Sequence, residues 1–148
     1  MTVETFYSAT VQPDWLDALN HVYFLEYQRA ADKATDQFWI AVGGMPASSA
    51  ETTLSVVIVE THVRYLRELR LGDAIEIRTR IVAFDRRRIH LEHAVMRSAE
   101  SSCVINVLAL AFDLATRTAT HWPHAMLQEF GRRCERLQAD RIGGLGVA

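Results

Sequence analysis

A short stretch near the N-terminus combines a carboxylate with the expected start of a helix. Asp17 precedes Asn20, a residue type that often caps helices, and helical spacing begins just after it. The first helical turn leaves backbone N–H groups without partners, and these can hold a carbonyl oxygen that gains negative charge. Asp17 could then act as a nucleophile or as the base that activates a water. A simple capping role for Asp17 is the structural alternative.

A long helix is expected directly behind this carboxylate. Apolar residues recur at intervals of three and four from Phe24 to Ala41, and charged residues cover the other side. With Asn20 as N-cap and residues 43–44, both glycine, as the stop, the pattern predicts a helix of about two dozen residues. Alanines in the apolar stripe would let a sheet pack closely against it.

Strands flank this helix in the sequence. One is expected before it, at residues 5–12, and a loop of small residues, 45–52, follows it. Alternating apolar and polar residues then predict three strands, and a run that is apolar in both phases predicts a fourth, covered on both faces. These four are expected at Leu54–Tyr65, 75–81, 88–95 and 103–112, and a short C-terminal helix after residues 122–123 carries Met126, Phe130 and Leu137.

This order of elements indicates a single α+β domain over residues 1–148, with one five-stranded antiparallel sheet wrapped round the helix. Residues 139–148 are expected to form a flexible tail. The helix can cover only one face of the sheet, yet the other face also carries apolar residues. A partner subunit is the simplest cover, so we expect a homodimer or a homotetramer.

Composition narrows the possible partners. The 148 residues carry a net charge of −2, so no global positive field attracts nucleic acid or an anionic membrane surface. The N-terminus lacks the features of a secretory signal, and no apolar run approaches the roughly 20 residues that a bilayer requires. Cys103 and Cys134 lack metal-ligand spacing and are expected to be free thiols, which favours a cytoplasmic location.

The order of elements and the segment around Asp17 resemble the hotdog fold of acyl-CoA thioesterases related to 4-hydroxybenzoyl-CoA thioesterase. Asp17, His21, Val22 and Tyr27 occupy the family's Asp, His or Ile, Val and aromatic positions without a gap. Residues 60–65 and the Gly-Asp pair that follows are also similar to the family's second strand and turn. The segment from Trp15 to His21 is similar to thioesterases that act on betainyl-CoA.

The resemblance implies an acyl-CoA thioesterase that releases a free acid and coenzyme A. In that reading Asp17 is the nucleophile or general base, and backbone N–H groups from His21 through Val22 to Tyr23 form the oxyanion hole. His21 could orient Asp17 or the pantetheine arm, or be a hydrogen-bonded structural histidine. Neither a cofactor nor a metal is implied, since the acyl-CoA is the substrate.

Departures from the family pattern point to the acyl site. Asn20 stands where many relatives have glycine, close to the substrate carbonyl, and Tyr23-Phe24 replaces a pair of asparagines. Trp15 and Tyr23 are free of the helix's core stripe and are predicted to line the acyl pocket. An aromatic wall there could hold a trimethylammonium group by cation–π attraction or an aryl ring by stacking.

The strand Leu54–Tyr65 supplies further candidates. Strict alternation places Val57 and Val63 on one face and Glu60 and His62 on the other, away from the helix. There Glu60 and His62 could support acid–base chemistry or form an acyl-pocket wall at a subunit interface. An ion pair with nearby arginines is the structural alternative.

An arginine turn, Arg86, Arg87 and Arg88, separates two predicted strands. Guanidinium groups match phosphate oxygens, and the resemblance implies that this turn holds the phosphates of coenzyme A. Exposed charge runs of this kind are also common at solvated hairpin tips.

Two other functions stay open. A hotdog dimer could bind acyl-CoA without catalysis. An enoyl-CoA hydratase of the same fold is disfavoured, because those enzymes typically separate the Asp from the His by four residues, whereas three lie between Asp17 and His21.

Overall fold

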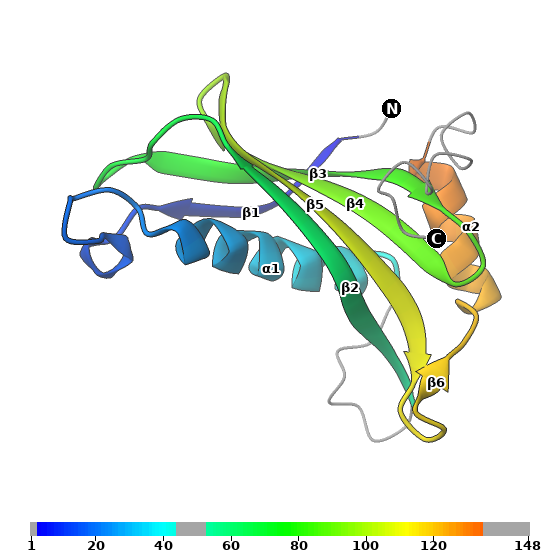
Figure 1. Ribbon diagram of the computed structural model, residues 1–148. Coiled ribbons are helices and arrows are strands. Elements are labelled where there is room, and N and C mark those ends of the chain that lie inside the picture. The colour runs from blue at the N-terminus through cyan, green and yellow to red at the C-terminus, as the bar shows by residue number, and fades with distance from the viewer. Residues whose placement is uncertain (1–2, 44–52, 135–148) are drawn as a thin grey trace.

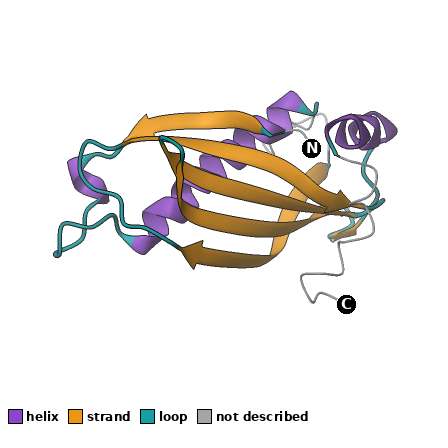
Figure 2. Cartoon of the chain, turned by 90° about the horizontal axis from the view of Figure 1, so that it is seen from above, coloured by secondary structure: helices purple, strands orange, loops and turns teal. Residues whose placement is uncertain are grey.

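A long helix lies in the curve of an antiparallel sheet in the computed structural model, which describes residues 3–43 and 53–134 (Figures 1 and 2). In chain order the elements are β1 (Glu4–Thr10), a 3₁₀ turn η1 (Pro13–Trp15), α1 (Phe24–Ala41), β2 (Leu54–Tyr65), β3 (Ala74–Phe84), β4 (Arg88–Arg97), β5 (Glu100–Asp113), β6 (Thr118–Ala119) and α2 (His124–Arg133). The predicted hotdog arrangement is confirmed.

The strands follow the order β1-β3-β4-β5-β2, and every pairing is antiparallel. The two-residue strand β6 pairs with the end of β5 and adds a short sixth member to the five that were predicted. Strands β1 and β2 therefore form the two edges of the sheet. The segments 45–52 and 139–148, predicted to be a loop and a tail, lie outside the described residues, as does Leu137.

Helix α1 packs closely because its buried side is rich in small residues. Its buried positions are Tyr27, Ala30, Ala31, Ala34, Thr35, Phe38 and Trp39. The helix ends as predicted, with Gly43 at φ +80 just beyond its C-cap. Its start differs from the prediction, because the first helical residue is Phe24 and the N-cap is Tyr23, so the helix has 18 residues.

A β-bulge in β2 changes which residues face α1. The register with β5 shifts between Ile58 and Glu60, so that Val59 is an extra residue. Before the bulge Val57 pairs with Leu110, whereas after it Val63 packs into the core beneath α1. The expectation that Val57 and Val63 share a face is therefore wrong, because strict alternation holds only in a regular strand.

A chain of hydrogen bonds crosses the core from the sheet to α1. His93 on β4 is fully buried, with Nδ1 2.8 Å from Oγ1 of Thr79 and Nε2 2.9 Å from Oγ1 of Thr35. The Thr35 hydroxyl donates to the carbonyl of Ala31 at 2.9 Å, so it accepts from Nε2–H of His93. Nδ1 then accepts from Thr79. A neutral imidazole thus satisfies every polar group in this chain.

An aromatic cluster closes the C-terminal end of α1. Trp39 stacks on Trp122 with ring centroids 5.5 Å apart, and Phe130 of α2 contacts both rings edge-on. Pro123 is the N-cap of α2, so the predicted helix start is confirmed. This end of the domain lies next to the β3–β4 turn, because Trp122 N–H donates to the carbonyl of Arg86 at 2.9 Å.

Candidate active site

A closed loop between η1 and α1 holds Asp17. Its N–H donates to the carbonyl of His21 at 2.8 Å, and its Oδ1 accepts from the N–H groups of Leu19 at 2.8 Å and His21 at 3.2 Å. Asn20 sits in the tight part of this loop at φ +60, a conformation that asparagine tolerates well. The second carboxylate oxygen, Oδ2, has no hydrogen-bond partner among residues 3–43 and 53–134.

Asn20 does not cap α1, contrary to the prediction. Its left-handed backbone turns the chain three residues before the helix, and the N-cap Tyr23 makes no side-chain hydrogen bond. Asp17 does not cap the helix either, because its Oδ1 closes its own loop. The first turn of α1 therefore keeps unpartnered N–H groups, as a helix start without a side-chain cap must.

Three of the predicted oxyanion donors already have partners. The N–H of Val22 donates to Leu69 at 3.3 Å and that of Tyr23 to Trp15 at 2.8 Å, while the N–H of His21 binds Asp17. The next amide, Phe24 N–H, has no partner within the described part of the chain. These bonds tie the loop to its surroundings, so the three predicted N–H groups are not free to bind a substrate oxygen in this structure.

Asp17 and the start of α1 share one cleft of about 430 Å³. Its lining comes from the Asp17 loop, the first turn of α1 and the end of β2 with the loop behind it: Asp17, His21, Val22, Tyr23, Phe24, Tyr27, Tyr65, Leu66, Arg67 and Glu68. The Tyr65 hydroxyl donates to the carbonyl of Phe24 at 3.2 Å, and its ring meets Tyr27 edge-on. The structure thus assembles Asp17, His21, Val22 and Tyr23 in one place.

Trp15 and Asn20 lie outside the lining of this cleft. Trp15 packs against the core and borders a small cavity on another flank of α1, with Tyr7 and Lys33. Its backbone carbonyl, which accepts from Tyr23, is its link to the site. The aromatic residues that border the cleft are Tyr23, Phe24, Tyr27 and Tyr65, and Trp15 is not among them.

Glu68 is a site residue that sequence reasoning did not single out. Its Oε2 lies 2.8 Å from Nε2 of His21, and Arg70 binds its other oxygen. Glu68 lies in the connection between the predicted strands Leu54–Tyr65 and 75–81, and nothing local in the sequence indicates that this connection folds back onto the start of α1. A buried leucine, Leu69, between charged residues is the single hint of such an anchor.

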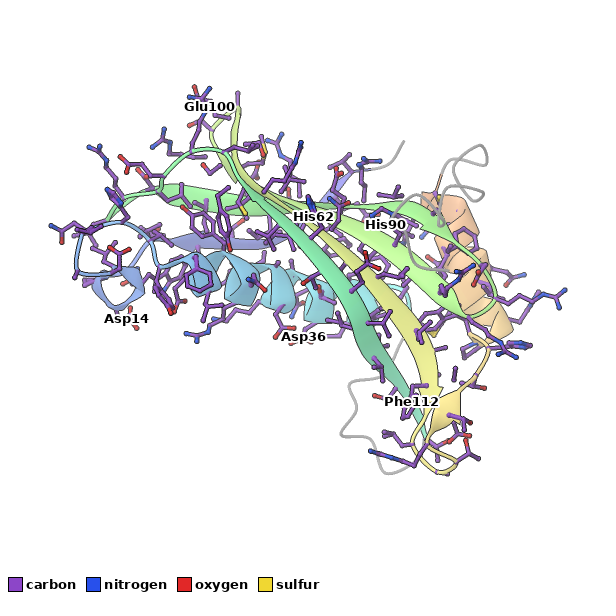
Figure 3. All side chains as sticks on the ribbon, viewed as in Figure 1. Asp14, Asp36, His62, His90, Glu100 and Phe112 are labelled. Atoms are coloured by element: carbon purple, nitrogen blue, oxygen red, sulfur yellow. The ribbon has the colours of Figure 1, made fainter. Side chains whose placement is uncertain are left out.

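Glu60 and His62 lie on the face of the sheet that turns away from α1, as expected. They pair with Leu108 and Asn106 of β5, and Figure 3 places His62 and His90 on that same face. Nε2 of His90 lies 2.7 Å from the Asn106 side chain, and burial lowers the pKa of His90. This polar cluster does not border the Asp17 cleft.

The arginine turn lies at the other end of the domain. Arg86, Arg87 and Arg88 border an open cavity of about 560 Å³ at the β3–β4 turn. Arg88 is 2.7 Å from Asp85, whose Oδ1 also accepts from the N–H groups of Arg87 and Arg88. From Phe24 to Trp39, whose stacked partner Trp122 touches this turn, the helix rises about 22 Å. Within one chain the arginine turn is therefore far from Asp17.

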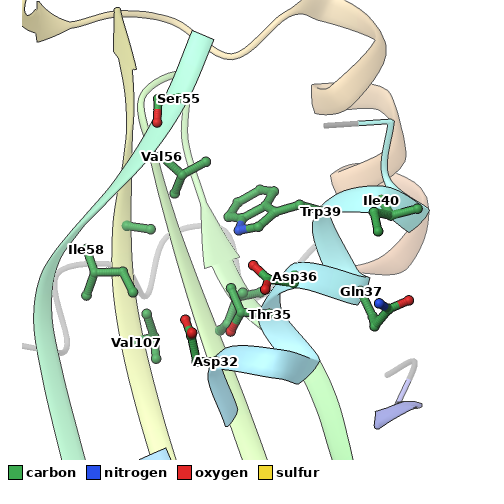
Figure 4. Close-up of a pocket in the computed structure, with 12 residues that line it drawn as sticks. Asp32, Thr35, Asp36, Gln37, Trp39, Ile40, Ser55, Val56, Ile58 and Val107 are labelled. Carbon is green, nitrogen blue, oxygen red and sulfur yellow. The ribbon is translucent and has the colours of Figure 1, made fainter. Parts of the chain in front are cut away.

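A groove runs between α1 and the β2 edge (Figure 4). Its two adjoining cavities, about 420 and 360 Å³, share Asp32, Thr35, Ile58 and Val107. Apolar side chains from β2 and β5 form one wall, and the helix forms the other. Leu25, in the first turn of α1, borders its near end, so the groove begins beside the Asp17 cleft.

Neither cysteine is placed to act as a nucleophile. Cys103 and Cys134 are both buried, and burial raises the pKa of the Cys103 thiol to about 12. Across residues 3–43 and 53–134, no group of His, Cys, Asp and Glu side chains converges in a way that could hold a metal ion. No helix in those ranges is both long enough and apolar enough to span a bilayer.

The sequence profile of the thioesterase-like superfamily matches residues 11–130. The chain is 30% identical over 93 residues to a betainyl-CoA thioesterase of Pseudomonas aeruginosa, covering 63% of this chain and 58% of that protein. It is 27% identical over 140 residues to an L-carnitine dehydrogenase/betainyl-CoA thioesterase of Agrobacterium fabrum, covering 94% of this chain and 28% of that protein. The chain thus spans less than two thirds of these relatives.

Solved structures share the fold. A Staphylococcus aureus protein in complex with CoA superposes with a TM-score of 0.81 at 20% identity, covering 91% of this chain and 89% of that one. A 1,4-dihydroxy-2-naphthoyl-CoA thioesterase from Synechocystis gives 0.77 at 14% identity, covering 87% and 96%. At these identities the likeness extends to the fold alone.

Proposed function

The chain belongs to the thioesterase-like superfamily, and from this premise we propose that it hydrolyses an acyl-CoA thioester to a carboxylic acid and free coenzyme A. One observation carries the proposal. Oδ2 of Asp17 and the N–H of Phe24, neither of which has a hydrogen-bond partner among the described residues, belong to residues that border the same cleft, beside the positive end of α1. A thioester carbonyl needs both an attacking group and a donor for its oxygen.

In the proposed reaction the carbonyl oxygen binds the N–H of Phe24. Oδ2 of Asp17 then attacks the carbonyl carbon, or removes a proton from a water that does so. The negative charge that develops on the oxygen is stabilised by this N–H and by the helix dipole. The C–S bond breaks, coenzyme A leaves, and water supplies the oxygen of the acid. Both roles of Asp17 give the same products.

A panel of acyl-CoA thioesters tests this function by release of free thiol. Short-chain, long-chain, aryl and betainyl-CoA should be included, with betainyl-CoA first because two relatives carry its name. We expect one class to be cleaved well above the spontaneous rate. If none is cleaved while acyl-CoA still binds, the chain is a binding module and the proposed function is wrong.

A second copy of the chain is proposed to complete the substrate site. Strand β2 is a long sheet edge, and at its bulge Ile58 and Val59 are 47% and 46% exposed. If two β2 edges pair antiparallel about a two-fold axis, the α1 helices run in opposite directions. The arginine turn of one copy then lies toward the Asp17 end of the other copy. Within a single chain these two features lie at opposite ends of α1.

This dimer predicts the effect of a charge at the β2 edge. Val59→Lys should convert the protein from dimer to monomer, because the new ammonium group would be buried against its symmetry mate. Val3→Lys, an equally exposed position beside the other edge of the sheet, should leave the dimer intact. Analytical ultracentrifugation measures both. A dimer that survives Val59→Lys but not Val3→Lys would place the interface on β1 instead.

The arginine turn is proposed to hold the phosphates of coenzyme A. Replacing Arg86 and Arg87 with alanine should raise KM for an acyl-CoA about tenfold, as expected for the loss of charge-assisted hydrogen bonds, with little change in kcat. The matching acyl-pantetheine, which lacks the nucleotide phosphates, is the control substrate. Its KM should not respond to the substitutions. Equal effects on both substrates would contradict phosphate binding at this turn.

A further inference from the structure

Glu68 approaches the His21 imidazole with one carboxylate oxygen while the other is held elsewhere. Oε2 lies 2.8 Å from Nε2 of His21. Oε1 accepts two hydrogen bonds from the guanidinium of Arg70, at 3.0 Å from Nε and 2.6 Å from Nη2. The N–H of Arg70 in turn donates to Asp73 at 2.8 Å. Arg70 thus orients the Glu68 carboxylate through Oε1, and Oε2 faces His21.

The loop that carries Glu68 is tied to the site at the next residue. Leu69 is buried; its N–H donates to the Tyr27 hydroxyl at 3.2 Å, and its carbonyl accepts from Val22 at 3.3 Å. One of these bonds reaches α1 and the other reaches the residue after His21. These two bonds therefore hold Glu68 next to His21, although the two residues are far apart in the sequence.

The charge state of Glu68 selects one form of the imidazole. Hydrogen bonds from Arg70 hold the pKa of the Glu68 carboxyl below its usual range, so the group is ionised and can only accept. At 2.8 Å from this carboxylate, a protonated Nε2 of His21 is favoured over a bare one. In a neutral imidazole this leaves Nδ1 with its lone pair, and Nδ1 has no partner in the described ranges.

Stability alone does not account for this arrangement. The side chains of His21 and Glu68 are 48% and 41% exposed, and ion pairs at such exposure contribute little to folding. The contact nevertheless favours one tautomer of a histidine that borders the same cleft as Asp17. The contact is therefore expected to affect proton transfer more than the free energy of unfolding.

We propose that Glu68 is a positioning residue that holds His21 in its Nε2–H tautomer, so that Nδ1 relays the proton of thioester hydrolysis. This inference rests on the proposed function. As the oxygen of water bonds to the acyl carbon, one of its protons moves to Nδ1; the imidazolium then gives that proton to the coenzyme A thiolate. One O–H and the C–S bond break, while one C–O and one S–H bond form. If Asp17 is the nucleophile, the same transfer to Nδ1 occurs when water hydrolyses the acyl-Asp17 anhydride. If Asp17 is the base, it passes the proton from Oδ2 to Nδ1.

The substitution Glu68→Gln tests the relay. A glutamine can donate to Nε2 and so favour the other tautomer; a comparable acid-to-amide change lowers kcat about 10⁴-fold in serine proteases. For this more exposed pair we expect kcat to fall about 100-fold with KM within about threefold. Glu129→Gln is the matched control, since Glu129 is likewise held by arginines, Arg132 and Arg133 of α2, but does not border the Asp17 cleft. It should leave kcat unchanged.

Two further measurements separate positioning from a structural role. The ¹⁵N resonances of the His21 ring should show protonated Nε2 and bare Nδ1 in the wild type, and a changed tautomer in Glu68→Gln. His21→Gln should lower kcat similarly, and the double variant should be no slower than either single one. Unchanged kcat in Glu68→Gln, or a protonated Nδ1 in the wild type, overturns the inference. If no acyl-CoA is cleaved, the proposed function fails, while the tautomer measurement still decides whether Glu68 sets the imidazole.

Discussion

Replacing Asp17 with asparagine is expected to lower kcat/KM for the best acyl-CoA by about 10³-fold or more, equivalent to about 4 kcal/mol of lost transition-state stabilisation. An amide is neither a nucleophile nor a base at neutral pH, so the attack on the carbonyl loses its driving group. The amide oxygen can still accept from Leu19 and His21, and the loop should therefore keep its shape. Thiol release under saturating and limiting substrate measures the effect.

Asp14→Asn is the matched control for this experiment. Asp14 lies three residues earlier in η1, is exposed, and does not border the Asp17 cleft (Figure 3). Its replacement should leave kcat/KM within about twofold, as is usual for surface substitutions. Circular dichroism and thermal unfolding establish that both variants are folded. Turnover by Asp17→Asn within a few-fold of the wild type would mean that another group performs the attack.

Acidification is expected to destabilise the fold through His93. Burial lowers the pKa of this imidazole to about 4, whereas an unfolded histidine titrates near 6.5. Above pH 6.5 neither state binds the proton, so the full stability is present. Between pH 6.5 and 4 the unfolded state alone takes it up, and the free energy of unfolding should fall by about 3 kcal/mol. Urea titrations at pH 7.5 and 4.5 measure the difference.

His93→Gln isolates this contribution, because an amide can bridge Thr35 and Thr79 but does not titrate. The variant should be less stable at pH 7.5 yet lose less stability on acidification than the wild type. His90, whose pKa burial also lowers, contributes to the loss in both proteins and cancels in the comparison. His62→Gln, at an exposed position, should behave as the wild type. Equal losses in the wild type and His93→Gln would contradict the assignment.

The sequence by itself determined which segments are helix and strand, since that information is local. Helical spacing marked α1, alternation gave the bounds of β2 at Leu54–Tyr65, and the doubly apolar run correctly predicted the buried strand β5. These patterns arise because each element must turn its own apolar residues inward. The same local logic placed Asp17 ahead of a helix start.

Local patterns were least reliable where the chain departs from regular geometry. Asn20 is a residue type that often caps helices, yet it adopts a left-handed conformation here. Its loop is closed by hydrogen bonds to Asp17 and joined by further hydrogen bonds to Trp15 and Leu69. The bulge at Val59 placed Val57 and Val63 on opposite faces of β2. Both features depend on pairing with distant strands and loops, which no periodicity within the segment records.

Only the tertiary structure decided which candidates meet. It brought Glu68 close to His21 through the anchoring of Leu69. It gave partners to the N–H groups of His21, Val22 and Tyr23, and it set the arginine turn about 22 Å along α1 from the Asp17 cleft. Such contacts join residues far apart in the chain, and they form only when loops close and a shared core fixes their ends. Residue types and spacing indicated the chemistry, whereas packing selected the atoms available to perform it.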